Sequence, residues 1–138
     1  MMELLNYLKE ENVELFKENL HVDLIDEKDE NGYTFLHHVV TMGNYEIADF
    51  LVYNGVDVNI RDKRGNTPLH LAAELNEKEI FKLLLEYGGD LTIKNNNQRT
   101  PEQIAKMNRA INVLKAIENY SEDYGYCEKM HAPKKWDE

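Results

Sequence analysis

The stretch that decides the fold runs from Asp62 to Lys94 and reads DKRGNTPLHLAAELNEKEIFKLLLEYGGDLTIK. It opens with turn chemistry, because Gly65 tolerates a positive φ and Pro68 suits a first helical turn, where its missing N–H costs nothing. Apolar residues then recur at helical spacing over 69–73 and again over 80–85, with a polar break between the two runs. Two glycines follow the second run, as they follow many helices. The stretch therefore predicts a turn followed by two antiparallel helices.

The same pattern occurs 33 residues upstream, over Asp29–Arg61. Its matching positions are Asp29, Gly32, Thr34, Leu36, His37, Glu46, Ile47, Leu51, Gly55 and Asp57, in register with Asp62, Gly65, Thr67, Leu69, His70, Glu79, Ile80, Leu84, Gly88 and Asp90. Downstream, Thr100, Pro101 and Ala105 keep the register. One such helix pair cannot bury its apolar stripes alone, so the repetition predicts a stack of pairs.

The chain resembles the ankyrin-repeat family, and the motif TPLHLA at 67–72 carries the resemblance. The resemblance covers residues 29–117 well and 1–28 weakly. It implies an all-α solenoid of helix-turn-helix pairs with short β-turn fingers. As a guide to function the motif is weak, because the shared role of the family is to hold other macromolecules.

We expect one domain over 1–118, followed by a tail. The domain divides into a degenerate N-terminal cap repeat (1–28), two full repeats (29–61 and 62–94) and a C-terminal cap repeat (95–118). In the first cap, helices are predicted over Glu3–Lys9 and Val13–Leu20. Their expected inward-facing residues are Leu4, Leu5, Leu8, Val13, Leu15, Phe16 and Leu20.

The last unit departs from the pattern. Gln98 stands in place of the glycine, and Glu102 and Gln103 stand where the other units have Leu-His. Polar residues at positions that are otherwise buried indicate that no further repeat stacks on that side. The unit still has apolar residues at helical spacing, at Met107, Ala110, Ile111, Val113, Leu114 and Ile117.

The tail, residues 119–138, is aromatic and charged. Its aromatic residues are Tyr120, Tyr124, Tyr126 and Trp136. Two interpretations stay open. The tail folds back over the end of the stack, or it is a mobile segment that carries a short linear motif. Its aromatic content argues against an inert disordered segment.

The charge is acidic and unevenly placed. The net charge is −10 and the mean hydropathy is −0.64, as expected of a soluble protein. Residues 1–61 carry 13 acidic and 4 basic side chains, a balance of −9, whereas residues 62–138 carry 13 and 12, a balance of −1. Such a surface disfavours direct binding of nucleic acid, which needs a basic stripe. It favours a basic protein partner, steered toward the N-terminal half.

The sequence predicts a cytoplasmic protein that does not bind membranes. No apolar run reaches the roughly 18 residues that span a bilayer, and the N-terminus lacks the pattern of a secretion signal. Cys127 is the only cysteine, which excludes an internal disulfide and fits a reducing compartment. Later delivery elsewhere, for example through a C-terminal signal, remains open. We expect a monomer.

The histidines invite a chemical interpretation, but a structural one is stronger. The family resemblance implies that His37 and His70 bond backbone groups of neighbouring turns. His38 occupies a normally apolar position, and two interpretations stay open: a partly buried, pH-sensitive residue, or one packed between helices.

No enzyme, metal or cofactor is predicted. Cys127 and His131 have helical spacing, but a zinc site needs four ligands, or three and a water, and no second pair lies nearby in the sequence. Asp57 and Asn59 fit turn chemistry, because a calcium loop would continue with further oxygen ligands and a final glutamate. Nucleophile, phosphate-loop and paired-carboxylate signatures do not occur in the sequence.

The resemblance implies that partners dock in a concave groove formed by the turn tips and the first helix of each pair. Carried onto this sequence, the predicted partner-binding residues are Glu30, Asn31, Tyr33, Met42, Lys63, Arg64, Asn66, Glu74, Leu75, Asn96, Asn97, Arg99 and Met107. Met42, Leu75 and Met107 are apolar where solvent favours polar side chains. These three either extend the core or anchor a partner, and their recurrence in successive units favours binding.

Two functions follow as hypotheses. The first is a non-catalytic binding module that inhibits or neutralises one protein, for example a basic toxin nuclease as immunity proteins do. The alternative is an adaptor or secreted effector-type protein whose repeats hold a target while the tail carries a motif or signal.

Overall fold

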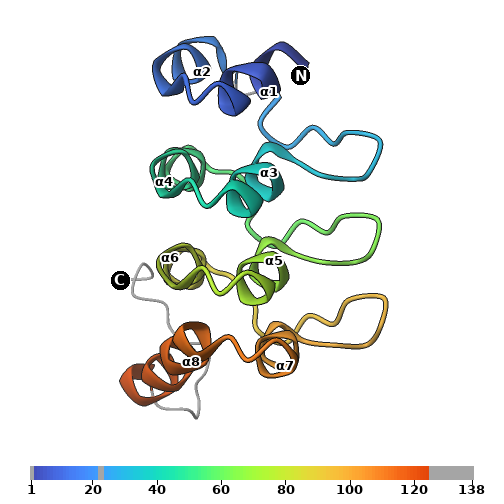
Figure 1. The fold of residues 1–138 in the computed structure, drawn as a ribbon, viewed down its shortest axis with the longest axis vertical. Coiled ribbons are helices and arrows are strands. Elements are labelled where there is room, and N and C mark those ends of the chain that lie inside the picture. Colours follow the sequence, from blue (N-terminus) through green and yellow to red (C-terminus); the bar gives the residue numbers. More distant parts are fainter. Residues whose placement is uncertain (1, 22–23, 125–138) are drawn as a thin grey trace.

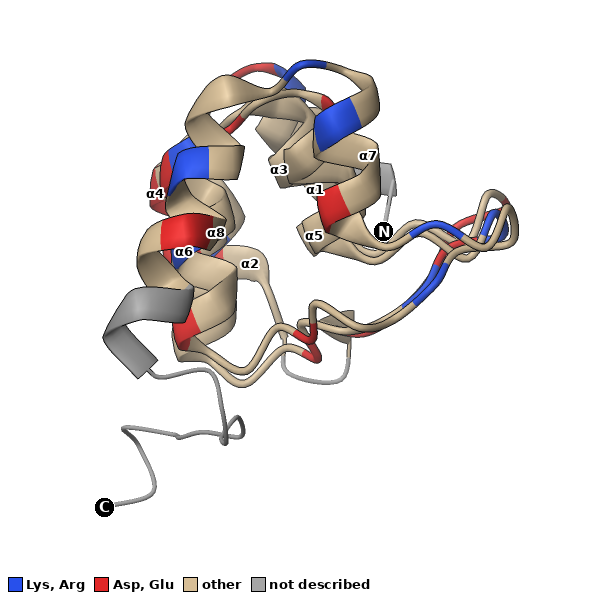
Figure 2. Ribbon diagram, turned by 90° about the horizontal axis from the view of Figure 1, so that it is seen from below, with Lys and Arg blue, Asp and Glu red and all other residues tan. Residues whose placement is uncertain are grey.

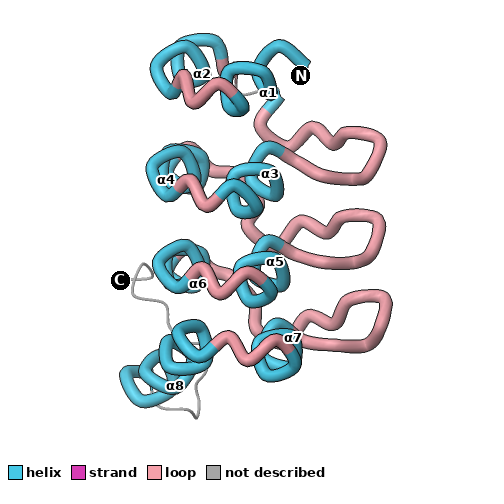
Figure 3. The backbone as a smooth tube through the Cα atoms, in the orientation of Figure 1, coloured by secondary structure: helices cyan, strands magenta, loops and turns pink. Residues whose placement is uncertain are grey.

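The computed structural model describes residues 2–21 and 24–124, and within them the chain forms eight helices and no strand (Figures 1 and 3). The helices are α1 (Met2–Lys9), α2 (Val13–Asn19), α3 (Phe35–Met42), α4 (Tyr45–Tyr53), α5 (Pro68–Glu74), α6 (Lys78–Glu86), α7 (Pro101–Met107) and α8 (Ile111–Tyr124). None of these helices is long and apolar enough to cross a membrane.

The helices form four pairs that stack in chain order: α1 with α2, α3 with α4, α5 with α6, and α7 with α8 (Figure 1). The first helices form one column, in which α5 contacts both α3 and α7. The second helices form another, in which α6 contacts α4 and α8. Seen along the stack, the pairs superpose and the connecting fingers project to one side (Figure 2). The predicted all-α ankyrin-type solenoid is confirmed.

Apolar side chains from both columns share one core. Its largest fully buried apolar members are Phe16, Phe35, Phe81, Leu8, Leu36, Ile47, Leu51, Leu69, Ile80 and Leu84. The degenerate first pair joins this core through Phe16, whose ring meets that of Phe35 edge to face with centroids 5.4 Å apart. An ion pair between Lys17 Nζ and Glu46 Oε2, 3.2 Å apart, connects the same two pairs at the surface.

Each finger contains a tight turn shortly before the helix that follows it. The residue three positions before the first residue of that helix has a positive φ. In the three fingers this residue is Gly32 (φ 78°), Gly65 (φ 79°) and Gln98 (φ 65°). A Cβ atom on Gly32 or Gly65 would lie 2.8 Å from a backbone nitrogen of the next finger, so only glycine fits there. The described chain has no further finger that the Gln98 side chain could clash with. The only energetic cost of a side chain at this position is therefore that of the left-handed backbone conformation.

The fingers are joined to one another by hydrogen bonds. Lys63 N–H donates to Asn31 O (3.3 Å), and Asn96 N–H donates to Arg64 O (2.9 Å). On the other side, Lys28 Nζ donates to Arg61 O, and an Arg61 guanidinium nitrogen donates to Lys94 O at 2.7 Å. These bonds hold the fingers in line and so fix the surface they present.

Some sequence expectations need correction. Leu15 was expected to face inward but is exposed, because α2 turns Phe16 into the core. Ile111, one of the apolar residues at helical spacing in the last unit, is exposed at the start of α8. The last helix runs on to Tyr124, past the predicted end of the fourth unit at residue 118. Residues 125–138, most of the predicted tail, lie outside the described part of the chain.

Candidate protein-binding face

The first helices are held to the fingers by a threonine and a histidine three residues apart. In α3, the Thr34 hydroxyl accepts from His37 N–H, and His37 Nδ1 accepts from Thr34 N–H at 3.1 Å. Thr67 and His70 repeat this capping box in α5. In α7, Gln103 takes the place of the histidine, and its Oε1 accepts from Thr100 N–H at 2.9 Å. This reciprocal capping satisfies N–H groups that a helix start leaves unpaired.

The far side of each imidazole reaches the next finger. His37 Nε2 lies 3.2 Å from Asn66 O, and His70 Nε2 lies 2.9 Å from Arg99 O. Because Nδ1 accepts a hydrogen bond, Nε2 must carry the proton and donate it, so each ring is neutral in this arrangement. Burial lowers the pKa of both His37 and His70, and the backbone carbonyls only partly oppose it. The structural interpretation of these two histidines is therefore confirmed.

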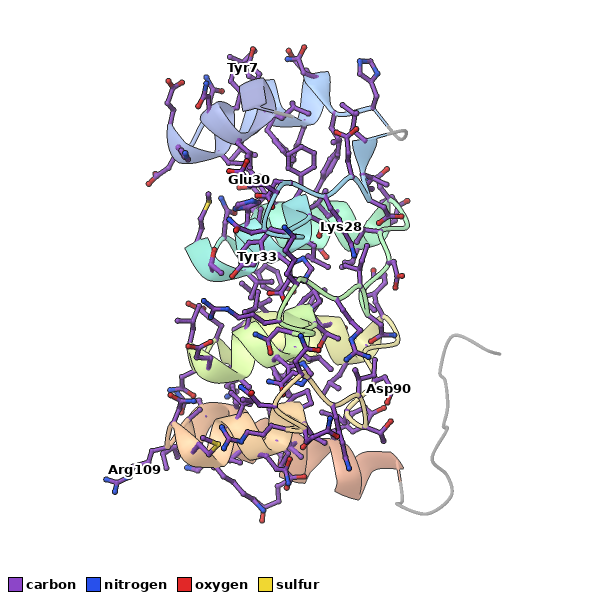
Figure 4. All side chains as sticks on the ribbon, turned by 90° about the vertical axis from the view of Figure 1, so that its right-hand side faces the viewer. Tyr7, Lys28, Glu30, Tyr33, Asp90 and Arg109 are labelled. Atoms are coloured by element: carbon purple, nitrogen blue, oxygen red, sulfur yellow. The ribbon has the colours of Figure 1, made fainter. Side chains whose placement is uncertain are left out.

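We call the surface made by the finger tips (30–33, 63–66 and 96–99) and the ends of the first helices (41–42, 74–75 and 107–108) the inner face. In Figure 2, the fingers project from the side of the stack on which the first helices α3, α5 and α7 lie. The fingers and the first helices therefore border the same side of the molecule. Figure 4 looks onto the fingers and places Glu30 and Tyr33 toward the side of Arg109, which follows α7. Asp90 lies on the opposite side.

Tyr33 is the centre of an aromatic cluster on this face. Its ring stacks on His37, with centroids 5.2 Å apart, and meets His38 edge to face at 5.2 Å. The side chain is half-buried. Burial raises the pKa of Tyr33, as do the carboxylates of Asp62, Glu74 and Asp29, while Arg64 opposes the rise. Tyr33 therefore lies among charges contributed by two successive fingers and by α5.

His38 and Asp29 form a partly buried pair beside this cluster. His38 Nε2 lies 2.9 Å from Asp29 Oδ2, and each side chain is about one-fifth exposed. Asp29 Oδ1 accepts from the N–H groups of Asn31 and Tyr33. Burial alone would raise the pKa of Asp29, but the hydrogen bonds from His38, Tyr33 and Asn31 together lower it. His38 thus braces the first finger against α3.

The predicted apolar anchors are exposed. Met42 is 40%, Leu75 45% and Met107 56% exposed, so none of them is part of the buried core. Met42 and Leu75 occupy equivalent positions 33 residues apart, and the third member of that series is Asn108. Met107 stands one position earlier. The repeated apolar position therefore extends over two units, with Met107 beside it in the third.

Two of the predicted partner-binding side chains are used to hold the fingers together. Asn66 Oδ1 accepts from Asn95 Nδ2, and Asn96 Nδ2 donates to Lys63 O, both at 2.9 Å. Asn96 is nevertheless exposed, as are the remaining predicted polar residues of the finger tips, Glu30, Asn31, Lys63, Arg64, Asn97 and Arg99. Glu74 is exposed at the end of α5.

Sequence reasoning missed Asp62, which lies buried directly before the finger tip 63–66 of this face. The repeat pattern predicts no more than a repeated position for Asp62, yet the residue is buried and its charge raises the pKa of the Tyr33 phenol. The missed signal lies in a comparison of the two repeats. The aspartate recurs, as Asp29 and Asp62, but His38 is replaced by Leu71 at the equivalent position. The partner of the carboxylate changes between units even though the turn does not.

The described residues hold no group of three His, Cys, Asp or Glu side chains close enough to bind a metal ion. Cys127 and His131, weighed in the sequence as ligands, lie outside those residues. Asp57 Oδ1 accepts from Asn59 N–H at 3.0 Å, which is the expected turn role.

Comparison with models of protein families gives a match. The sequence model of a protein family described as "Ankyrin repeats (3 copies)" matches residues 2–95 and 54–126, which together cover most of the chain. A search of curated proteins found no match.

Proposed function

Because the chain belongs to the ankyrin-repeat family, whose repeats are generally non-catalytic protein–protein interaction modules, we propose that it binds one protein partner through its inner face. The observation that carries this proposal is the exposure of Met42 and Leu75 at equivalent helix ends, beside the half-buried Tyr33. Apolar and aromatic side chains bordered by charge are typical of binding hot spots. The exposed finger-tip residues would form the polar rim.

The partner is basic, and binding neutralises it. The support is the balance of −9 over residues 1–61, which steers a positively charged protein toward the first two helix pairs. A stack with one such face is better suited to block a partner than to bridge two. A toxin nuclease held by an immunity protein is the concrete version of this proposal. The protein would act as a monomer in the cytoplasm.

Affinity capture with the full chain tests the proposal. The expected partner is a protein of high isoelectric point, whose association rate falls steeply as salt is raised because steering between exposed charges is screened. Its own activity should be lost in the complex. Captured partners that are all acidic or neutral, or a partner whose binding ignores salt, would contradict the inhibitor proposal.

An adaptor function is the second candidate, and the aromatic residues of the tail favour it. Removing residues 125–138 leaves α8 intact and separates the two proposals. An inhibitor keeps its partner and its effect after this truncation. An adaptor loses one partner, or its delivery, while the repeats still bind the other.

A further inference from the structure

Asp62 leaves one buried carboxylate oxygen without a hydrogen bond. The residue is only 7% exposed. Its Oδ1 accepts from Arg64 N–H at 2.8 Å and from Asn66 N–H at 3.0 Å. Its Oδ2 is buried and has no hydrogen-bond partner among the described residues. A buried carboxylate oxygen without a donor is costly, so this atom calls for an explanation.

The other two repeats satisfy the equivalent atom. In the first, Asp29 Oδ2 is paired with His38 Nε2 at 2.9 Å. In the third, the position holds Asn95, whose Nδ2 donates to Asn66 Oδ1. In the second, the counterpart of His38 is Leu71 in α5, a buried residue whose apolar side chain has no hydrogen-bond donor. From the equivalence of the repeats, Asp62 Oδ2 faces α5 at the place where the first repeat supplies an imidazole.

The surroundings of this oxygen favour a cation. The pKa of Tyr33 is raised by burial and then by the charge of Asp62, with Glu74 and Asp29 adding to it and Arg64 opposing. The carboxylates of Asp62 and Glu74 therefore both interact electrostatically with the Tyr33 hydroxyl. Leu75, next to Glu74, offers exposed apolar surface. These groups suit one long basic side chain. It would find two carboxylates, of Asp62 and Glu74, to bind its charge, and the ring of Tyr33 and the side chain of Leu75 for apolar contact.

We propose that Asp62 Oδ2 accepts a hydrogen bond from an arginine of the protein partner, which rests on the inner face being the binding surface. The guanidinium has five N–H donors in a plane, so it can donate to Asp62 and Glu74 together while its flat face covers Tyr33. Because Oδ2 is covered in the free chain, a neighbouring side chain changes rotamer as the arginine enters, as is common at interfaces.

The test uses N-acetyl-arginine amide as the probe and its citrulline analogue, which has nearly the same shape but no charge, as the control. Both are titrated into the full ¹⁵N-labelled chain while the amide signals of Arg64 and Asn66 are followed, because these N–H groups bind the other oxygen of Asp62. We expect saturable shifts with arginine and about tenfold weaker binding of citrulline, as befits the loss of a charged hydrogen bond.

Two variants and a matched control complete the test. Asp62→Asn should weaken arginine binding about tenfold. An amide is tolerated at the equivalent position, where Asn95 caps the same turn. Leu71→His should also weaken it, by supplying the internal donor that His38 gives Asp29. Asp90→Asn removes the same charge far from the inner face and should leave binding unchanged (Figure 4). Thermal unfolding confirms that each variant is folded.

Equal shifts with arginine and citrulline, no saturable shift, or unchanged binding by Asp62→Asn would overturn the proposal. The captured partner separates this failure from that of the proposed function. If alanine at Tyr33, Met42 and Leu75 abolishes its binding but Asp62→Asn does not, only the arginine site is wrong. If neither change matters, the inner face is not the binding surface.

Discussion

His70 Nε2 lies 2.9 Å from the carbonyl oxygen of Arg99, while the other nitrogen of the same ring accepts a hydrogen bond from Thr67 N–H. One buried imidazole therefore fixes the start of its own helix and the position of the next finger. His37 does the same one repeat earlier, with Thr34 and Asn66. The inner face is thus supported by bonds that require neutral histidines.

Stability should fall as the pH drops below about 6.5. The pKa of His37 and of His70 is lowered from 6.5 by burial, so the unfolded chain binds more protons than the folded chain in that range. This part of the stability is present above pH 6.5 and is lost as the pH falls toward the lowered folded pKa. Urea unfolding at pH 7, 6 and 5 measures it.

The control for this pH dependence is His70→Gln, because Gln103 already completes the same capping box in α7. This variant should lose less stability between pH 7 and 5 than the wild type. Asp29 titrates in a lower range, since its pKa is lowered from 3.8, and so does not mask the effect. Stability that is flat from pH 7 to 5 in the wild type would refute the role given to the histidines.

Leu84→Ala should destabilise the chain by roughly 2–5 kcal/mol, through lost burial and the cavity that remains. Leu84 is fully buried in α6 and belongs to the shared apolar core. Tyr53→Ala, on an exposed side chain of α4, is the comparison and should change stability by less than about 0.5 kcal/mol. Chemical denaturation gives both values. An unchanged midpoint for Leu84→Ala would show that the assigned register is wrong.

Gln98→Gly should stabilise the chain by about 1 kcal/mol, because it removes the cost of a left-handed backbone and this exceeds the entropy lost by glycine. Gly65→Ala should do the opposite, since its Cβ would lie 2.8 Å from Asn96 N. Thermal unfolding of the two variants compares them directly. A destabilised Gln98→Gly would mean that the glutamine side chain has a role in the turn.

The helices were predictable because the period of 33 residues aligns turn, cap and apolar positions in successive units. The histidine role followed from the family resemblance. The orientation of Leu15 did not follow, since neighbouring apolar residues in a short helix compete for one buried face and Phe16 occupies it. The missing hydrogen bond of Asp62 Oδ2 could not be predicted either. A sequence pattern identifies a turn residue, but it does not give the hydrogen-bond partner of each side-chain atom.

The most direct test of the account is the dissociation constant of the purified partner for the Tyr33/Met42/Leu75 triple alanine variant. Three exposed tyrosines of the second-helix column and its following turns, Tyr45, Tyr53 and Tyr87, provide the matched control when all are changed to alanine. We predict about a hundredfold weaker binding for the first variant and wild-type affinity for the control. Wild-type affinity of the first variant, with weakened binding of the control, would contradict the assignment of the inner face.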